Sequence, residues 1–279
     1  MRTAALITHS HPSAVADAIE IGVAVAAEAG WRLVARREEL DKFGPAAAGI
    51  VVVDDVLPEI CLVLGGDGSI LHALRRYAHT GVAVFGINFG TVGFLAAVDR
   101  GEAAAGIRRA LAGEIETIEL PGLEVSVGDA KGVGLNDITL ARQPHDRVAE
   151  LSYRIAGEEV GHVRCDGLVA ATPAGSTGYN LANQGPILAW GVKGYVVSYI
   201  SPHSLTARAL VVAPGDVLHV GNAAGREPVE VAIDGSQFCE LAAGAALEVR
   251  FVEAVGRLAQ LPGSSFYQRI REKFGHLAV

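Results

Sequence analysis

The chain has 279 residues, of which 50% are hydrophobic and 6% aromatic, and its formal net charge is −8 at pH 7. This length allows two domains of ordinary size, each with a buried core. The negative charge argues against a protein that binds nucleic acid or an anionic membrane, because such binders depend on clustered Lys and Arg. It does not exclude a nucleotide substrate, because backbone N–H groups, a divalent cation and a few arginines can bind phosphates.

The cysteines and the apolar runs indicate a cytoplasmic protein. Cys61, Cys165 and Cys239 are widely spaced and form no CxxC pair, which suits a reducing compartment. The first residues turn polar too soon for a signal peptide, and no apolar run reaches the roughly 20 residues of a membrane span. The pair His9 and His11 lacks further ligands at metal-binding spacing, so we expect a turn there and no metal ligands from the chain.

Strand-like and helix-like segments alternate over residues 1–114. The expected strands are residues 4–7, 31–35, 60–64 and 82–87, and the expected helices are residues 15–29, 69–78 and 101–113. Residues 36–53 are ambiguous. The alternation predicts an α/β, Rossmann-like domain with a parallel sheet, whose ligands gather at the carboxyl ends of its strands.

Short β-rich runs separated by glycine and polar turns fill residues 115–261. The expected strands are residues 123–127, 138–141, 148–155, 160–164, 168–171, 195–200, 209–212, 217–220, 229–233 and 246–251. This pattern predicts an all-β, mostly antiparallel, sandwich-like second domain.

A final helix is expected over residues 265–276, in a segment (262–279) that we assign to the first domain. Its charged residues, Arg269 among them, leave Phe266, Ile270 and Phe274 on one face at spacing i, i+4, i+8. This face is expected to pack on the first domain.

The tetrapeptide Gly65-Gly66-Asp67-Gly68 follows an apolar strand and precedes a helix. Its glycines let the backbone take positive φ and leave N–H groups bare, so the turn can bind an anion at the helix N-terminus. A carboxylate among such amides would repel phosphate, unless Asp67 takes a proton from an attacking hydroxyl or works with a metal ion. The alternative is a β-to-α turn with Asp67 as helix cap. A second glycine turn, residues 88–95, is expected on the same edge.

Polar residues also gather in the second half. Asn136 and Asp137 could contact one ligand only if their strand begins irregularly, because alternate strand residues face opposite ways. Arg164 and Asp166 share a face and could pair with each other or line a site. The loop of residues 172–182 offers hydroxyl, amide and glycine groups suited to an adenine edge and ribose hydroxyls, the alternative being a helix start capped by Ser176.

Four motifs follow one another in order, and together they resemble the NAD kinase family over most of the chain. They are Gly65-Gly66-Asp67-Gly68, Asn136-Asp137, the 172–182 loop with Gly185-Pro186, and Ile233-Asp234-Gly235. The resemblance implies an α/β domain and a β-rich domain with NAD bound between them, in a homo-oligomer (dimer or tetramer). It also implies transfer of the ATP γ-phosphate to the 2′-hydroxyl of the adenosine ribose of NAD. Since the few arginines cannot neutralise that phosphate, we expect a divalent cation, Mg or Mn, to accompany ATP.

By position, Asp67 is similar to the family's catalytic base, and Asn136 with Asp137 to its dinucleotide-binding amide and acid, the acid being Glu in many members. The phosphate side of the site would include Gly65, Gly66, Gly68 and His72. The adenosine-binding loop would be formed by Thr177, Gly178, Tyr179, Asn180, Leu181 and Ala182, with the Tyr179 ring against the dinucleotide. Further residues that line the site in relatives correspond to Arg147, Arg164, Asp166 and Gln237.

Two other functions are compatible with parts of this pattern. A lipid or sphingoid kinase shares the glycine turn, but it would need a means of meeting a membrane, and no basic amphipathic helix is evident. A non-catalytic dinucleotide sensor could keep the 172–182 loop but would not need Asp67 in the glycine turn.

Overall fold

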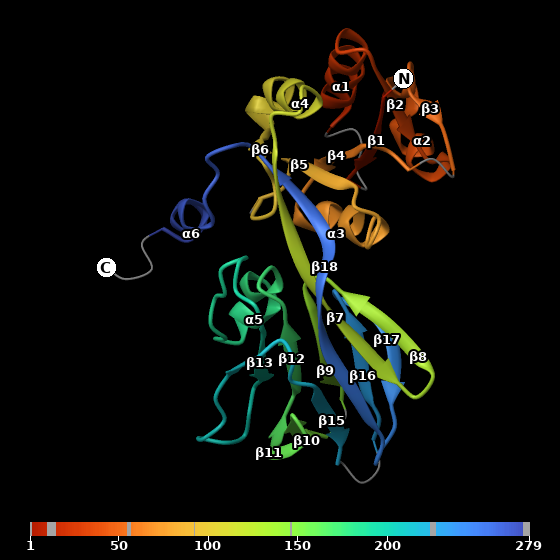
Figure 1. The fold of residues 1–279 in the computed structure, drawn as a ribbon. Helices are drawn as coiled ribbons and strands as arrows, with labels where there is room; N and C mark the ends of the chain where they lie inside the picture. Colours follow the sequence, from red (N-terminus) through yellow and green to blue (C-terminus); the bar gives the residue numbers. More distant parts are fainter. Residues whose placement is uncertain are drawn as a thin grey trace. The chain divides into compact units, whose positions relative to one another are not determined.

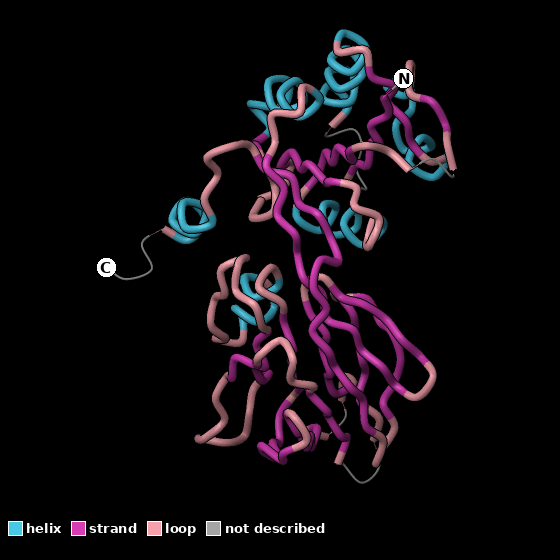
Figure 2. Tube along the Cα trace, viewed as in Figure 1, coloured by secondary structure: helices cyan, strands magenta, loops and turns pink. Residues whose placement is uncertain are grey.

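The computed structural model describes residues 2–9, 15–54, 57–91, 93–145, 147–223 and 227–275. It divides into two compact units, Met1–Glu119 with Gly256–Val279, and Leu120–Val255. Helices gather in the first unit, whereas the second is nearly all strand (Figure 2). The observed boundaries fall within strands β7 (Glu116–Val127) and β18 (Ala246–Gln260), and the expected boundaries, after residues 114 and 261, lie just before β7 and just after β18.

The first unit contains a parallel sheet, as predicted. Its strands follow the order β18-β5-β4-β1-β2-β3, and β6 pairs with β5. The bounds are β1 (Arg2–Thr8), β2 (Trp31–Ala35), β3 (Val51–Val52), β4 (Ile60–Gly65), β5 (Ala83–Asn88) and β6 (Val98–Asp99). All strand neighbours from β5 to β3 are parallel, so their carboxyl ends lie at one edge.

Helices cover both faces of this sheet (Figure 1). They are α1 (Ala16–Glu28), α2 (Arg37–Phe43), α3 (Asp67–Arg76) and α4 (Ala103–Leu111). On one face, Ile19 of α1 and Ile107 of α4 are buried in a core with Phe85 of β5. On the other, Ile70 of α3 packs so closely over Gly86 that a Cβ there would lie 2.3 Å from its Cδ1 atom. The ambiguous residues 36–53 form α2, a 3-10 turn and the two-residue β3.

The last helix, α6 (Phe266–Phe274), packs on the first unit through the ring of Phe94. The ring centroid of Phe94 lies 5.7 Å from that of Phe266 and 5.9 Å from that of Phe274, so the expected apolar face is confirmed. Arg269 departs from the expected solvent-facing pattern, because its side chain is buried with Ile270.

The second unit is a β-sandwich, as predicted. One antiparallel sheet has the order β14-β13-β12-β9-β16-β17, and the other contains β11-β10-β15-β18 with the β7–β8 hairpin. The strands and the one helix not yet bounded are β8 (Ala130–Gly134), β9 (Asp137–Arg142), β10 (Ala149–Ile155), β11 (Glu158–Cys165), β12 (Gly167–Ala171), β13 (Tyr195–Ile200), β14 (Leu210–Val212), β15 (Leu218–Asn222), β16 (Val229–Ile233), β17 (Ser236–Leu241) and α5 (Tyr179–Ala182). Apolar side chains from both sheets form one core between them.

Two strands of this unit were not predicted. β8 carries a lysine and two glycines, and β17 is a largely exposed strand at the edge of its sheet. Neither buries enough of one face to show a clear alternation of apolar and polar residues, and both form because a hairpin partner supplies their hydrogen bonds.

None of the helices in the described part of the chain has the length and apolar character that a membrane crossing requires. The three cysteines, all within the described residues, are unbridged.

Candidate functional site

The Gly65–Gly68 turn joins the carboxyl end of β4 to the first turn of α3. Contrary to expectation, none of its three glycines has a positive φ; Gly66, the residue before the helix, has φ −90°. Close approach explains Gly65, where a Cβ would lie 2.5 Å from Oγ of Ser69. A Cβ on Gly66 would make only an ordinary contact, 3.5 Å from Cα of Gly90, and one on Gly68 would have open space around it.

The second glycine turn lies on the same edge, as predicted, because Gly65 and Asn88 end paired parallel strands. The backbone N–H of Phe89 donates to the carbonyl of Gly65 over 3.0 Å. Asn88 shapes the turn by accepting from the N–H of Gly90 and donating to Asp99. Gly93 has φ +66° and no room for a Cβ, which would lie 2.2 Å from Nδ2 of Asn88.

Asp67 joins these two turns. Its Oδ2 accepts the N–H of Phe94 and its Oδ1 accepts the N–H of Leu95, both over 2.8 Å. Asp67 is therefore not the helix cap, a position that Gly66 occupies without a side-chain hydrogen bond. The two bonds fix the direction of a half-buried carboxylate, and each oxygen keeps a further lone pair.

A cavity of about 380 Å³ lies beside the start of α3. Gly66, Gly68, Ser69 and the exposed His72 line it together with Lys42 of α2. Lys42 also lies 2.6 Å from Glu39, whose other oxygen accepts the N–H of Thr8. The cavity thus combines the N-terminus of a helix with an ammonium group, a combination that binds anions. His9 lines it too, whereas His11 lies outside the described residues.

In the second unit, the carboxylate of Asp234 organises the Asn136-Asp137 segment. It accepts three consecutive backbone N–H groups, from Leu135 (3.0 Å), Asn136 (2.7 Å) and Asp137 (3.1 Å). Asp234 itself has φ +48°, in the turn between β16 and β17. These bonds bend the chain at residues 135–136, which is the irregular strand start that a shared ligand would need.

The same segment is joined to the 172–182 loop. Thr172 donates through its N–H to the carbonyl of Asn136 (2.9 Å) and through its hydroxyl to that of Leu135 (2.6 Å). Gly175 lies against Asn136, where a Cβ would be 2.0 Å from the carbonyl oxygen. The side-chain Oδ1 of Asn136 is buried and has no hydrogen-bond partner among the described residues. A buried acceptor without a partner is costly, and a bound hydroxyl or N–H would satisfy it.

Asp137 lies beside this segment with 7% of its surface exposed. Burial, reinforced by the nearby charge of Asp234, raises its pKa from 3.8 to about 6, although a hydrogen bond from the hydroxyl of Thr139 opposes the shift. The carboxyl therefore titrates near neutral pH and resists carrying a charge.

Most of the expected adenosine-binding loop lies at the surface. Gly178, Tyr179 and Ala182 are exposed, whereas Thr177 and Leu181 are half-buried. Tyr179 is 43% exposed, so its ring is accessible to a ligand. A cavity of about 440 Å³ adjoins the end of the loop, between Ala182 and Arg208.

Asn180 differs from the rest of the loop, because it is fully buried. Its amide donates to the carbonyls of Ser176 (2.9 Å) and Pro186 (3.0 Å), so its side chain holds the loop together. Ser176 does not cap the helix. Its hydroxyl contacts the carbonyl of Pro173 and accepts the N–H of Leu188.

The remaining expected residues divide into two groups. Arg147, Arg164 and Gln237 are exposed. Asp166 forms its ion pair with Arg142 of the neighbouring strand β9, over 2.6 Å, and not with Arg164. The sequence could not show this pair, because it joins residues brought together by the sheet.

Two family models match this chain: the ATP-NAD kinase N-terminal domain over residues 38–115 and the ATP-NAD kinase C-terminal domain over residues 135–258. An NAD kinase of Symbiobacterium thermophilum is 36% identical over 243 residues, which span 82% of this chain and 86% of that protein. The chain belongs to the NAD kinase family. An NAD kinase of Natranaerobius thermophilus is 30% identical over 98% of both chains.

Solved structures of NAD kinases share the fold. The crystal structure of yeast NADH kinase complexed with NADH matches with a TM-score of 0.87 at 20% identity, covering 100% of this chain and 89% of that one. An NAD kinase from Archaeoglobus fulgidus in complex with ATP matches with a TM-score of 0.70 at 21% identity, covering 99% and 98%. These likenesses confirm the predicted fold class, an α/β part followed by a β-rich part.

The titration of Asp137 makes the stability of this NAD kinase depend on pH. Since the folded state raises the pKa of this carboxyl from 3.8 to about 6, its contribution to stability is present at low pH and lost as the pH rises through 6. Asp137→Asn removes the titration. The free energy of unfolding of the variant, relative to the wild type, should rise by up to about 3 kcal/mol between pH 4 and pH 8.

Urea unfolding of both proteins at pH 4, 6 and 8 would measure this difference. Asp129→Asn, in an exposed turn of the same unit, is the control and should show no such trend. A constant difference between Asp137→Asn and the wild type across this range would contradict the assignment.

Proposed function

We propose that this chain is an ATP-dependent NAD kinase, which transfers the γ-phosphate of ATP to the 2′-hydroxyl of the adenosine ribose of NAD and so makes NADP. One observation carries the proposal: Asp67 is held by two backbone amides at the start of a helix whose N-terminus faces an anion-binding cavity. The names of the relatives support the choice of NAD over a lipid acceptor. A dinucleotide sensor would not need this carboxylate.

Asp67 is the proposed general base. It takes the proton of the ribose 2′-hydroxyl while the hydroxyl oxygen bonds to the γ-phosphorus and the bond to the β-γ bridging oxygen breaks, releasing ADP. The amides of Phe94 and Leu95 fix the direction of the carboxylate, because each donates a hydrogen bond to one of its oxygens.

The donor phosphates are proposed to bind at the turn of Gly65, Gly66 and Gly68, with His72 and Lys42 at the side of the same cavity. A divalent cation, Mg or Mn, accompanies ATP and neutralises the developing charge. No group of three or more metal-ligating side chains is placed to hold an ion within the described part of the chain. The donor phosphates and water are therefore the proposed ligands of the cation.

The dinucleotide is proposed to bind along the segment that Asp234 organises. The unpartnered Oδ1 of Asn136 suits a ribose hydroxyl, and the exposed Tyr179 ring suits stacking against a base. Asn180 is proposed to shape the loop, because its side-chain amide donates to two backbone carbonyls. The further proposed contacts with the dinucleotide are Asp137, Arg147, Arg164, Asp166, Thr177, Gly178, Leu181, Ala182 and Gln237.

The direct test incubates purified protein with NAD and Mg-ATP and detects NADP with an NADP-specific dehydrogenase. Asp67→Asn and Asp67→Ala should both lower turnover by about 10²–10⁴-fold, because a positioned base is lost. Excess EDTA should abolish turnover. Unchanged turnover in Asp67→Ala would refute the assigned base, and no NADP from the wild type would refute the function.

Asp67→Asn needs a matched control, because an amide side chain can accept only one of the two N–H groups that the carboxylate accepts. Asp99→Asn also replaces a carboxylate that accepts a hydrogen bond in the same turn. It should lose only a few-fold in turnover, which separates loss of the base from loosening of the turn.

Tyr179→Ala should weaken NAD binding by about 1–3 kcal/mol, because a stacking ring is removed from an exposed position. Isothermal titration calorimetry with NAD measures the affinity. Tyr179→Phe keeps the ring and should keep the affinity. Equal affinities of the alanine variant and the wild type would reduce Tyr179 to a structural residue.

We further propose that the protein is a homo-oligomer, dimer or tetramer. β14 is an edge strand of its sheet, and Leu210, Val211 and the nearby Leu205 are 41%, 48% and 94% exposed. An edge strand with exposed apolar residues tends to be covered by another chain. Light scattering at micromolar concentration should give a mass that is a multiple of 28.9 kDa. Val211→Lys should lower this mass, because it places a charge on the exposed edge strand. Ile21→Lys, on α1, is the control and should leave the mass unchanged. A single-chain mass of the wild type would reject the proposal.

A cytoplasmic location also remains a proposal. Its support is that the three cysteines are unbridged and that burial raises the pKa of the Cys61 thiol, as expected for thiols with a packing role in a reducing compartment.

A further inference from the structure

The loop that binds Asp67 is itself held from its other side by the end of the chain. The guanidinium of Arg269, on α6, donates through Nη1 to the carbonyl of Phe94 (3.3 Å) and to that of Ala96, and through Nη2 to Oε1 of Gln260. Gln260, the last residue of β18, donates through Nε2 to the carbonyl of Leu95 over 3.0 Å. Three consecutive carbonyls, of residues 94–96, are thus held by two side chains.

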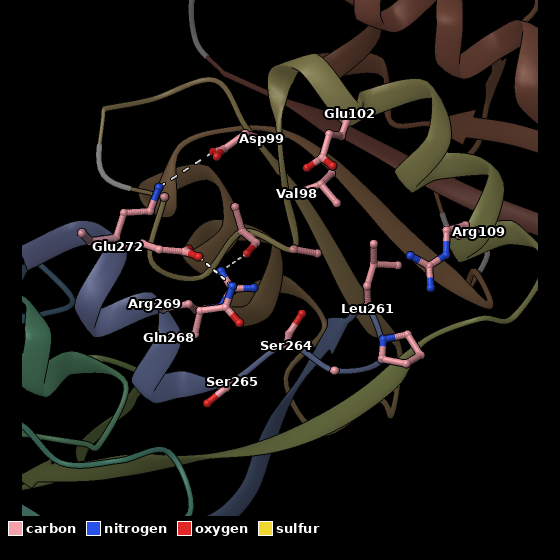
Figure 3. A pocket seen from close by; sticks show the side chains of 16 residues that line it. Val98, Asp99, Glu102, Arg109, Leu261, Ser264, Ser265, Gln268, Arg269 and Glu272 are labelled. Carbon is pink, nitrogen blue, oxygen red and sulfur yellow. Dashed lines mark hydrogen bonds and ion pairs between the residues drawn. The ribbon is translucent and has the colours of Figure 1, made fainter. Parts of the chain in front are cut away.

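Both side chains are deeply buried: Arg269 is 9% and Gln260 2% exposed. Burial lowers the pKa of Arg269, and this is opposed by the nearby carboxylates of Glu272, Asp67 and Asp99. Burying a guanidinium is costly unless its donors and charge are matched. Figure 3 shows Arg269 extending from α6 to the wall of a cavity of about 450 Å³, with Gln268 and Glu272 of the same helix beside it.

The two sets of hydrogen bonds act on the same short loop. The N–H groups of Phe94 and Leu95 donate to Asp67, and the carbonyls of the same two residues accept from Arg269 and Gln260. The carbonyl of Phe94 and the N–H of Leu95 belong to one rigid peptide group, so the bond from Arg269 to this carbonyl fixes the direction of the N–H that Leu95 donates to Asp67. A shift of this loop would therefore move Asp67.

We propose that Arg269, with Gln260, is a positioning residue for Asp67. It fixes the 94–96 loop that aims the carboxylate. The proposal rests on the proposed function, in which Asp67 is the base. The competing reading is that Arg269 only attaches α6 to the first unit, a task that the contacts of Phe94 with Phe266 and Phe274 already serve.

The test compares Arg269→Gln and Arg269→Lys with Arg271→Gln, a control that removes the same charge from the exposed side of the same helix. Steady-state kinetics with NAD and Mg-ATP are measured across pH 5–9. Besides Arg269, the charged groups near this loop are Glu272 and Lys273 of α6 and Asp99 of β6, and all variants keep them.

For Arg269→Gln we expect kcat to fall by about 10²-fold with KM for both substrates within a few-fold, because a base displaced by about 1 Å loses rate and not binding. Arg269→Lys should recover only part of the lost kcat, because an ammonium keeps the charge but lacks the planar fork of the guanidinium. Arg271→Gln should resemble the wild type.

A merely structural role would lower the thermal midpoint and scale the rate with the folded fraction, with no loss of kcat per folded molecule. That result in Arg269→Gln would overturn the proposal. Should Arg269→Gln not fold, Gln260→Met removes the bond to Leu95 and one partner of Arg269, and the same reduction in kcat at constant KM is expected; an unchanged kcat would overturn the proposal.

An activity-independent measurement separates this proposal from the function. In ¹H–¹⁵N NMR, the amide signals of Phe94 and Leu95, which donate to Asp67, should move in Arg269→Gln but not in Arg271→Gln, relative to the wild type. If the wild type makes no NADP, the proposed function fails while this change still tests the positioning. Identical amide signals in all three proteins would overturn the positioning role.

Discussion

Two carboxylates that accept consecutive backbone N–H groups organise this protein. Asp67 binds the amides of Phe94 and Leu95 in the first unit, and Asp234 binds those of Leu135, Asn136 and Asp137 in the second. Hydrogen bonds from N–H groups to an ionised acceptor are stronger than those between neutral groups. Each carboxylate in this way fixes a turn whose N–H groups have no strand or helix partner in the described part of the chain. The glycines, the asparagines and the loops of the candidate site all depend on these two arrangements.

Close approach, more than unusual backbone angles, explains several of the glycines around them. A Cβ on Gly90 would lie 3.1 Å from Cα of Gly66, one on Gly65 would lie 2.5 Å from Oγ of Ser69, and Gly175 leaves room for the carbonyl of Asn136. A methyl group at these places would push the turns apart and with them the amides that the carboxylates bind. Gly93, by contrast, needs both the space and the positive φ. The same motif residues thus have a packing role as well as any contact with a ligand.

The burial of ionisable side chains is the second constraint, and its effect on the pKa differs between Arg269 in the first unit and Asp137 in the second. Arg269 keeps its charge because carbonyls and nearby carboxylates surround it. Burial and the nearby carboxylate of Asp234 instead raise the pKa of Asp137, which favours its neutral form. Desolvation without a matching partner disfavours a charged group, whereas fixed dipoles of opposite sign stabilise it. A buried carboxyl with a raised pKa and a carboxylate fixed by amides are suited to different chemical tasks.

The sequence by itself determined the order of most elements, the parallel and antiparallel halves and the glycine turns, and it nominated Asp67, Asn136 and Tyr179 as candidate site residues. These follow from local properties: periodicity of apolar residues, turn chemistry and short motifs. Only the tertiary structure decided that Arg269 is buried behind the loop of Phe94, that Asp166 pairs with Arg142 and that the buried side chain of Asn180 holds its loop together. It also decided the strands β8 and β17 and the contribution of Lys42 to the cavity beside the start of α3. Each of these depends on residues that are distant in the sequence, or on a cavity lined by several helices and strands. The pattern of neighbouring residues in the sequence does not contain that information.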